Sequence, residues 1–233
     1  MKAIENECVL VVVAHPDDET LGCGGTINKL SECNDIHVLI LGEGLHSRAS
    51  KQQCIEASAV TAHKQNAEKA CASLGAKSVS ILDFPDNQFD SVPLLSIVKA
   101  IEAELLNIKP SILFCHYGGD LNIDHRCTYE AVVTAARPLQ GQSVKSIFCF
   151  ETPSSTEWRG AASGSSFIPQ LFVGLSKENV QAKIRAMEMY EQEARLAPHP
   201  RSPESLEALA RWRGSNCGCE FAEAFQLVRS ILA

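Results

Sequence analysis

The feature that most constrains the fold is a series of short apolar runs, each followed by a polar cluster. The first run covers residues 9–14, and its continuous β-branched character is typical of a strand buried on both faces, as in a parallel sheet. The sequence HPDDE follows directly at 15–19. Segments with helical periodicity separate this run from the later ones. This alternation of strands and helices predicts an open α/β sheet with right-handed crossovers.

The pattern predicts strands over 9–14, 36–41, 79–82, 111–115 and 145–150, and helices over 20–30, 50–74, 94–106 and 125–136. Beyond residue 151 it predicts a short strand over 172–175, helices over 177–195 and 203–213, and either a strand or a helix over 221–228. Neither a repeat nor a linker interrupts the pattern. We therefore expect one domain over 1–233, with a Rossmann-like, mostly parallel sheet and helices on both faces.

Composition narrows the classes of function. The formal net charge of the 233 residues is -7, whereas a general nucleic-acid binder should be basic, so we expect no nucleic-acid partner. No run approaches the roughly 20 apolar residues of a membrane span, and the N-terminus lacks a signal-peptide pattern. These features predict a cytoplasmic protein, in which the ten cysteines are reduced thiols.

Polar clusters follow several of the predicted strands. They cover 15–19, 42–48 and 116–125, and the loop at 84–90 adds a fourth. Ligands of open α/β sheets bind outside the carboxyl ends of the strands. The order of elements therefore predicts that these clusters meet at one edge of the sheet.

The first and third clusters carry candidate metal ligands. His15 and Asp18 are three residues apart, a spacing that suits a turn around one ion, and zinc accepts both imidazole and carboxylate ligands. Asp17 points elsewhere and is a candidate general base. His125, at a helix start after a later strand, is the best candidate for the third ligand, and Asp124 for a carboxylate that orients a histidine. Each motif alone would equally suit a turn or a helix cap.

Two stretches carry a resemblance to a known family. AHPDDE at 14–19 and DLNIDHR at 120–126 resemble the PIG-L/LmbE-like family of zinc-dependent N-deacetylases. The similarity extends to FPDN at 84–87 and HPRSP at 199–203. The family fold is a Rossmann-like α/β sheet. The resemblance to these N-deacetylases implies a metal-dependent amide hydrolase with that fold.

Carried over to this chain, the resemblance implies that His15, Asp18 and His125 bind one Zn²⁺ per chain and that Asp17 is the general base. It also implies a small-molecule substrate and is compatible with a homo-oligomer.

The chain departs from the family at one position. Many members have His-x-x-His in the second motif, where the first histidine polarises the substrate carbonyl, and this chain has Asn122 there. An asparagine amide can donate a hydrogen bond to an oxyanion, so Asn122 is a candidate catalytic residue, but it is neither a cation nor a comparable proton donor. His199 and His116 are the candidates for the missing role. We favour His199, because its HPRS segment resembles a stretch in one branch of the family.

Four further residues are candidates for substrate binding. Glu43 and Asp86 would accept hydrogen bonds from sugar hydroxyls. Arg48 and Arg201 would pair with a phosphate or carboxylate, although a solvated surface charge explains either arginine equally well.

The leading hypothesis is removal of an N-acetyl or other N-acyl group from an acetamido sugar or a nucleotide-linked sugar, in polysaccharide biosynthesis. A second reading is deacylation of a glycosylated thiol precursor or an antibiotic intermediate. A third, from a different class, is a non-catalytic nucleotide- or metal-binding module, suggested by the glycines at 22, 24 and 25. The carboxylates of HPDDE would repel a phosphate at that place, which argues against a nucleotide site.

Overall fold

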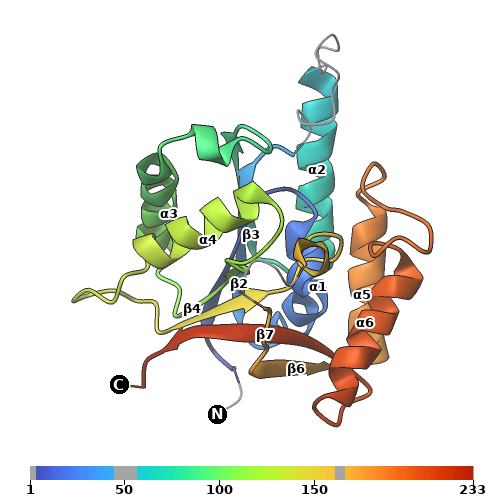
Figure 1. Ribbon diagram of the computed structural model, residues 1–233. Helices are drawn as coiled ribbons and strands as arrows, with labels where there is room; N and C mark the ends of the chain where they lie inside the picture. The colour runs from blue at the N-terminus through green and yellow to red at the C-terminus, as the bar shows by residue number, and fades with distance from the viewer. Residues whose placement is uncertain (1–3, 45–56, 161–165, 233) are drawn as a thin grey trace.

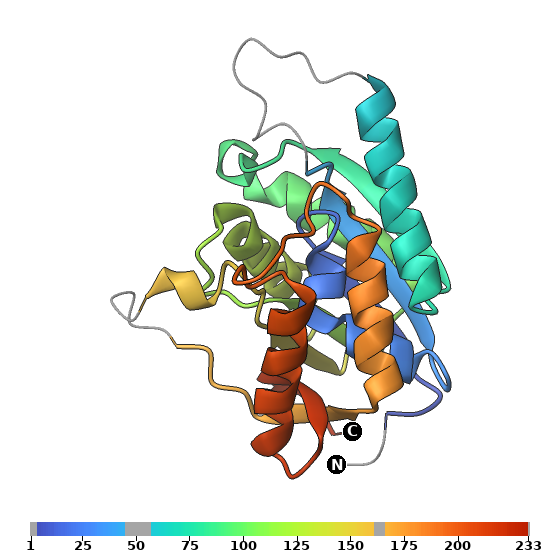
Figure 2. The ribbon, with the colours of Figure 1, turned by 90° about the vertical axis from the view of Figure 1, so that its right-hand side faces the viewer.

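The computed structural model describes residues 4–44, 57–160 and 166–232. A seven-stranded sheet with the order β3-β2-β1-β4-β5-β7-β6 forms its centre, and helices cover both faces (Figures 1 and 2). The first five strands have the order of a Rossmann-like fold. The predicted fold class is confirmed.

The strands are β1 (Cys8–Val13), β2 (Asp35–Gly42), β3 (Ser78–Phe84), β4 (Ile112–His116), β5 (Ser146–Phe150), β6 (Leu171–Leu175) and β7 (Phe221–Ser230). The α-helices are α1 (Asp18–Leu30), α2 (Ala57–Ser73), α3 (Leu94–Ile108), α4 (Ile123–Ala135), α5 (Lys177–Glu188) and α6 (Pro203–Ser215). Short 3₁₀ turns, η2 (Phe89–Ser91) and η3 (Glu157–Arg159), lie in the loops after β3 and β5.

The strand directions place several loops at one edge of the sheet. Strands β1 to β5 are parallel to one another, whereas β7 pairs antiparallel with both β5 and β6. The chain moves from β1 outward to β2 and β3, and then returns to place β4 on the other side of β1. The strand order therefore reverses between β1 and β4, the point at which such sheets bind ligands.

The sheet divides the hydrophobic core into two layers. Alternate side chains of a strand point to opposite faces, so Val11 belongs to the layer that contains residues of α1, α2, α5 and α6, whereas Val12 belongs to the layer that contains residues of α3 and α4. Figure 1 shows α3 and α4 on one side of the sheet and the other four helices on the opposite side. Because β1 is covered on both faces, its side chains are apolar without alternation, as the sequence predicted.

The second half of the chain differs from the sequence prediction at one helix and resolves one open alternative. The helix predicted over 177–195 ends at Glu188, and Tyr190 beyond it is buried and donates its hydroxyl to Glu19 Oε1 at 2.7 Å. This contact directs the following segment toward the carboxyl edge of the sheet. The region 221–228, left open between strand and helix, is a strand because it pairs with both β5 and β6.

The glycines of α1 serve close packing. A Cβ atom on Gly22 would lie 2.2 Å from Phe150 Cδ2, and one on Gly25 would lie 2.6 Å from Leu175 Cδ1. The helix therefore approaches β5 and β6 more closely than a larger residue allows. This packing accounts for the glycine cluster without a phosphate-binding loop.

Two expectations from composition concern membranes and thiols. No helix in the described ranges has both the length and the apolar character needed to cross a bilayer. All nine cysteines in those ranges are free thiols.

Candidate metal centre and active site

Three buried side chains meet where the strand order reverses. His15 follows the end of β1, Asp18 is the first residue of α1, and His125 lies in the first turn of α4. Asp18 Oδ2 is 3.4 Å from His15 Nδ1 and 3.3 Å from His125 Nε2, and one ligand atom from each residue lies within 4.8 Å of the others. Two imidazole nitrogens and a carboxylate oxygen are a donor set that suits zinc. The three residues therefore fit such an ion.

The second ring nitrogen of each histidine contacts a further carboxylate. His15 Nε2 lies 2.8 Å from Asp124 Oδ2, and His125 Nδ1 lies 3.0 Å from Asp120 Oδ1. Such partners hold a ligating imidazole in its orientation and tautomer. They leave Nδ1 of His15 and Nε2 of His125 facing Asp18.

The surrounding carboxylates make this point attractive to positive charge. Burial by itself lowers the pKa of His15, but hydrogen bonds to Asp124 and Asp18 outweigh it and raise the pKa to about 10. Burial is likewise outweighed at His125, where Asp18 and Asp120 raise the pKa to about 9. The negative potential that favours imidazolium also favours a divalent cation.

A second group of possible ligands overlaps the first. His15, Asp86 and Asp124 also lie within 4.8 Å of one another. Asp124, however, accepts backbone N–H bonds from Asn87 at 2.6 Å and Phe89 at 2.9 Å in addition to its contact with His15. Both carboxylate oxygens of Asp124 therefore already accept hydrogen bonds, which hold the loop after β3 in place. The group that includes Asp18 is therefore better suited to a cation.

Asp17 lies beside the metal-binding group in an unusual backbone conformation. It is the N-cap of α1 with a φ of 103°, and its N–H donates to Glu19 Oε2 at 3.1 Å. Its Oδ2 accepts a 2.6 Å hydrogen bond from Arg201 Nη1. Burial raises the pKa of Asp17 well above its usual value, although Arg201 opposes the rise. A carboxylate with a raised pKa is a stronger base, as a general base requires.

These groups share one cavity of about 120 Å³. It is lined by His15, Pro16, Asp17, Asp18, Gly44, Asp86, Asn87, Asn122, His125, Ser154, Ser155, Glu193 and Arg201. The structure thus brings the predicted base, the three predicted metal ligands and several polar side chains to a single place.

Asn122, which stands where many relatives of this motif have histidine, lines the cavity and caps α4. Its Oδ1 accepts the N–H of Asp124 at 2.8 Å, and its Nδ2 donates to Asn87 Oδ1 at 3.1 Å. An N-cap bond of this kind satisfies a backbone donor at the helix start. The amide is therefore held in place with its NH₂ group near the cavity.

His116 is neutral and fully buried behind the candidate ligands. The N–H of Ala14 donates to its Nε2 at 3.0 Å, which requires an unprotonated nitrogen there. Burial and the neighbouring His125 lower the pKa of His116 to about 4. The rings of His116 and His125 stack with centroids 3.8 Å apart. Since His116 does not line the cavity, its placement supports His125 rather than a substrate.

The structure does not support the catalytic role predicted for His199. This residue does not line the cavity; its ring packs edge-on against Trp158 with centroids 5.8 Å apart, and its Nδ1 accepts the N–H of Arg201 at 3.2 Å. A general acid must reach the atom that it protonates. The likeness of the surrounding segment to a family branch located the right stretch of chain, but the side chain that enters the cavity is Arg201.

The four predicted substrate-binding residues have different placements. Asp86 and Arg201 line the cavity, whereas Glu43 is buried beside the lining residue Gly44 without lining the cavity itself. Arg48 lies outside the described residues. Arg201 already contacts Asp17 and, at 2.7 Å, Glu193, so its positive charge is shared by two carboxylates. Substrate binding by Asp86 and Arg201 stays a prediction.

Sequence reasoning missed Asp120 and Glu193. Asp120 precedes His125 by five residues in the same motif, so a search for a carboxylate that orients this histidine would have found it. Glu193 fell in a predicted helix, and nothing local in the sequence indicated that it reaches the cavity.

The chain is similar in sequence to two proteins that are named as deacetylases, and similar in fold to a hydratase. It is 26% identical to the uncharacterized deacetylase YaiS of Escherichia coli, over 78% of this chain and 89% of that protein. It is also 26% identical to diacetylchitobiose deacetylase of Thermococcus kodakarensis, over 96% of this chain and 84% of that protein. The fold matches the crystal structure of GalB, the 4-carboxy-2-hydroxymuconate hydratase of Pseudomonas putida KT2440, with a TM-score of 0.74, 21% identity and 97% of both chains covered.

A family model supplies the decisive match. The model of the PIG-L family, described as GlcNAc-PI de-N-acetylase, matches residues 10–136. This range is more than half of the chain and contains both motifs with the candidate metal ligands. The chain therefore belongs to the PIG-L family of de-N-acetylases.

Proposed function

We propose that this protein is a zinc-dependent hydrolase that removes an N-acetyl group from an acetamido sugar. The observation that carries the proposal is the convergence of His15, Asp18 and His125 with Asp17 on one cavity. Three protein ligands with an open position are typical of catalytic rather than structural zinc. Family membership supports amide hydrolysis, and the name of the Thermococcus relative supports a sugar substrate.

One Zn²⁺ per chain would be held by His15 Nδ1, Asp18 Oδ2 and His125 Nε2. When bound, zinc supplies a Lewis acid that lowers the pKa of water and polarises a carbonyl oxygen. Asp120 and Asp124 keep the two imidazoles aimed at it through their hydrogen bonds.

Asp17 would transfer the proton. Its carboxylate accepts a proton from the attacking water and later donates it to the leaving nitrogen, so one group acts as base and then as acid. The hydrogen bond from Arg201 holds this carboxylate in the cavity. Asn122 Nδ2 would donate to the developing oxyanion, in place of the family histidine.

The cavity suggests how the substrate binds. Its volume of about 120 Å³ is below the roughly 300–1,000 Å³ that usually encloses a whole small-molecule ligand. We infer that the acetamido group enters the cavity while the rest of the sugar lies at its opening, where Asp86 accepts hydrogen bonds from hydroxyls. We infer that all residues of the reaction site come from one chain, which forms a single domain over 1–233. A cytoplasmic location, a role in polysaccharide biosynthesis and a homo-oligomer stay predictions.

Amine release tests the proposal. The purified protein is stripped with a chelator, reloaded with zinc, and incubated with free, nucleotide-linked and lipid-linked acetamido sugars, a glycosylated thiol precursor and an N-acylated antibiotic intermediate. We expect equal amounts of free amine and acetate from the sugars only after reloading. Because GalB, a hydratase, shares the fold, hydration of an unsaturated acid is measured in parallel. Absence of amine from every amide, or hydration alone, would reject the proposed function.

A further inference from the structure

Helix α1, which carries Asp18, is broken in its middle. Cys23 has φ -149° and ψ 25°, values outside the helical region, so α1 consists of two short helical segments. The first segment begins with the candidate metal ligand Asp18, and the second runs from Gly24 to Leu30. A break leaves carbonyl groups at the end of the first segment and N–H groups at the start of the second without helical partners.

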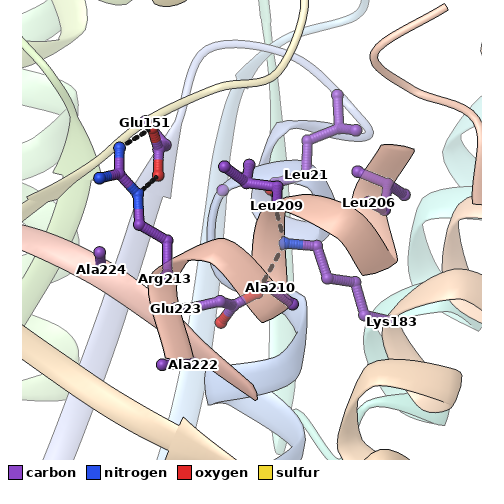
Figure 3. A pocket seen from close by; sticks show the side chains of 11 residues that line it. Leu21, Glu151, Lys183, Leu206, Leu209, Ala210, Arg213, Ala222, Glu223 and Ala224 are labelled. Atoms are coloured by element: carbon purple, nitrogen blue, oxygen red, sulfur yellow. Dashed lines mark hydrogen bonds and ion pairs between the residues drawn. The ribbon is translucent and has the colours of Figure 1, made fainter. Parts of the chain in front are cut away.

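A buried ion pair meets both ends of this break, and Figure 3 shows its two side chains, Lys183 and Glu223, near Leu21. Lys183 of α5 donates to the carbonyl oxygen of Leu21 at 2.8 Å and to Glu223 Oε1 at 2.6 Å. Glu223 of β7 accepts the N–H of Gly25 at 3.1 Å and that of Thr26 at 2.7 Å. The two charged side chains are only 7% and 6% exposed.

The charges match the dipoles of the two segments. A helix carries partial negative charge at its C-terminal end and partial positive charge at its N-terminal end. The ammonium group of Lys183 lies at the end of the first segment, and the carboxylate of Glu223 lies at the start of the second. Each charge therefore stabilises the end that it contacts, and the two neutralise each other.

Stability alone is a weak explanation for this pair. A buried ion pair can often be replaced by apolar residues without loss of stability, because the desolvation of two charges offsets their attraction. Here the pair does something that apolar residues would not do: it joins α5 and β7 to the backbone on both sides of the break. The short segment with Asp18 is thus tied to the sheet through Lys183.

We propose that Lys183 and Glu223 are positioning residues that hold the first segment of α1, and with it Asp17 and Asp18, in the geometry that the reaction needs. This inference rests on the proposed function. A misplacement of about 1 Å caused by a change far from the chemistry can cost about 100-fold in rate. The contact of Gly22 with Phe150 limits sideways movement of the segment, and the ion pair limits rotation at the break.

The test compares Lys183→Met and Glu223→Gln with a matched control. Arg213 and Glu151 form a second ion pair. It lines, together with Lys183 and Glu223, a small cavity that is separate from the active-site cavity (Figure 3). Its two hydrogen bonds of 2.6 Å run between α6 and the residue after β5. Its side chains are 17% and 18% exposed. Arg213→Met therefore also leaves a carboxylate without its cation, but it does not alter the bonds at the break in α1.

Two readouts separate positioning from stability. The first is the visible absorption spectrum of the Co²⁺-loaded protein, which reports the geometry of the metal site whether or not turnover occurs. The second is kcat against KM for amine release. We expect Lys183→Met and Glu223→Gln to shift the Co²⁺ bands and to lower kcat about 10- to 100-fold, with little change in KM. Arg213→Met should lower Tm with the wild-type spectrum and nearly the wild-type kcat.

The proposal is wrong if Lys183→Met and Glu223→Gln behave like Arg213→Met, with a lower Tm and an unchanged spectrum. If neither variant folds, Glu223→Asp is measured instead. Aspartate keeps the negative charge, but its side chain is too short to reach the N–H groups of both Gly25 and Thr26. An unchanged Co²⁺ spectrum of Glu223→Asp then overturns the proposal. Failure of the wild type to release amine rejects the proposed function instead, and the spectra still decide whether the ion pair positions the metal ligand.

Discussion

Arg201 Nη1 lies 2.6 Å from Asp17 Oδ2, a contact between residues 184 positions apart in the sequence. The same Nη1 atom lies 2.7 Å from Glu193 Oε2, and Arg201 Nε donates to Ser154 Oγ at 2.8 Å. One guanidinium thus joins the segment after α5, the loop after β5 and the start of α1. Arg201 thus holds the candidate general base, and Glu193 and Ser154 hold Arg201.

Replacement of Arg201 by glutamine should destabilise the protein. The change leaves the buried carboxylates of Asp17 and Glu193 without their cation, and breaking such a pair costs about 3–5 kcal/mol. Urea unfolding measures the loss. The control is Lys77→Gln, which removes a pair with Asp35 whose side chains are 59% and 57% exposed, and should cost at most about 1 kcal/mol. Equal losses in the two variants would contradict the structural role of Arg201.

Asp17→Asn should abolish most turnover while the metal stays bound. The amide has nearly the same size but cannot accept the proton of the attacking water, and general-base catalysis typically contributes about 100- to 10,000-fold. Amine release and metal content by atomic absorption are measured on the same sample. Asp83→Asn, at an exposed carboxylate on β3, is the control and should retain wild-type kcat. Turnover within about threefold of wild type in Asp17→Asn would exclude it as the base.

Zinc should stabilise the folded protein through three named ligands. A ligand at about 100 times its Kd adds about 2.7 kcal/mol when it binds only the folded state. Thermal unfolding with and without zinc after chelation should therefore give a higher Tm with the metal. His125→Ala should lose this increase, whereas His37→Ala, on β2 away from the cavity, should retain it. An unaltered zinc response in His125→Ala would remove this histidine from the ligand set.

Asp120→Asn should weaken metal binding without removing a ligand. Although burial opposes ionisation, hydrogen bonds from His125 and nearby hydroxyls lower the pKa of Asp120 to about 2, so this carboxylate is charged and orients the imidazole. Loss of such a partner typically weakens metal affinity by about 10- to 100-fold. Competition with a chromophoric chelator measures the affinity. Asp90→Asn, at an exposed position, should leave it unchanged; the same affinity in both variants would argue against the role of Asp120.

Much of the first half of the chain was predictable because its signals are local. A strand covered on both faces must be apolar at every position, so the run that forms β1 is visible in the sequence, as is the polar cluster that follows it. Parallel strands then bring their carboxyl ends to one edge, which predicts that His15 and His125 meet. The prediction for 177–195 was too long because periodicity continues past Glu188, whereas the buried hydroxyl of Tyr190 needs Glu19 as its partner.

The sequence by itself determined the α/β alternation, the position of the polar clusters and the identity of the candidate metal ligands and base. Only the tertiary structure decided that Arg201 and not His199 enters the cavity, that His116 supports His125 from behind, and that Lys183 and Glu223 meet at the break in α1. The reason is physical: apolar periodicity reflects which face of an element is buried and can be read locally. The direction of a polar side chain depends on partners that folding brings from distant parts of the chain.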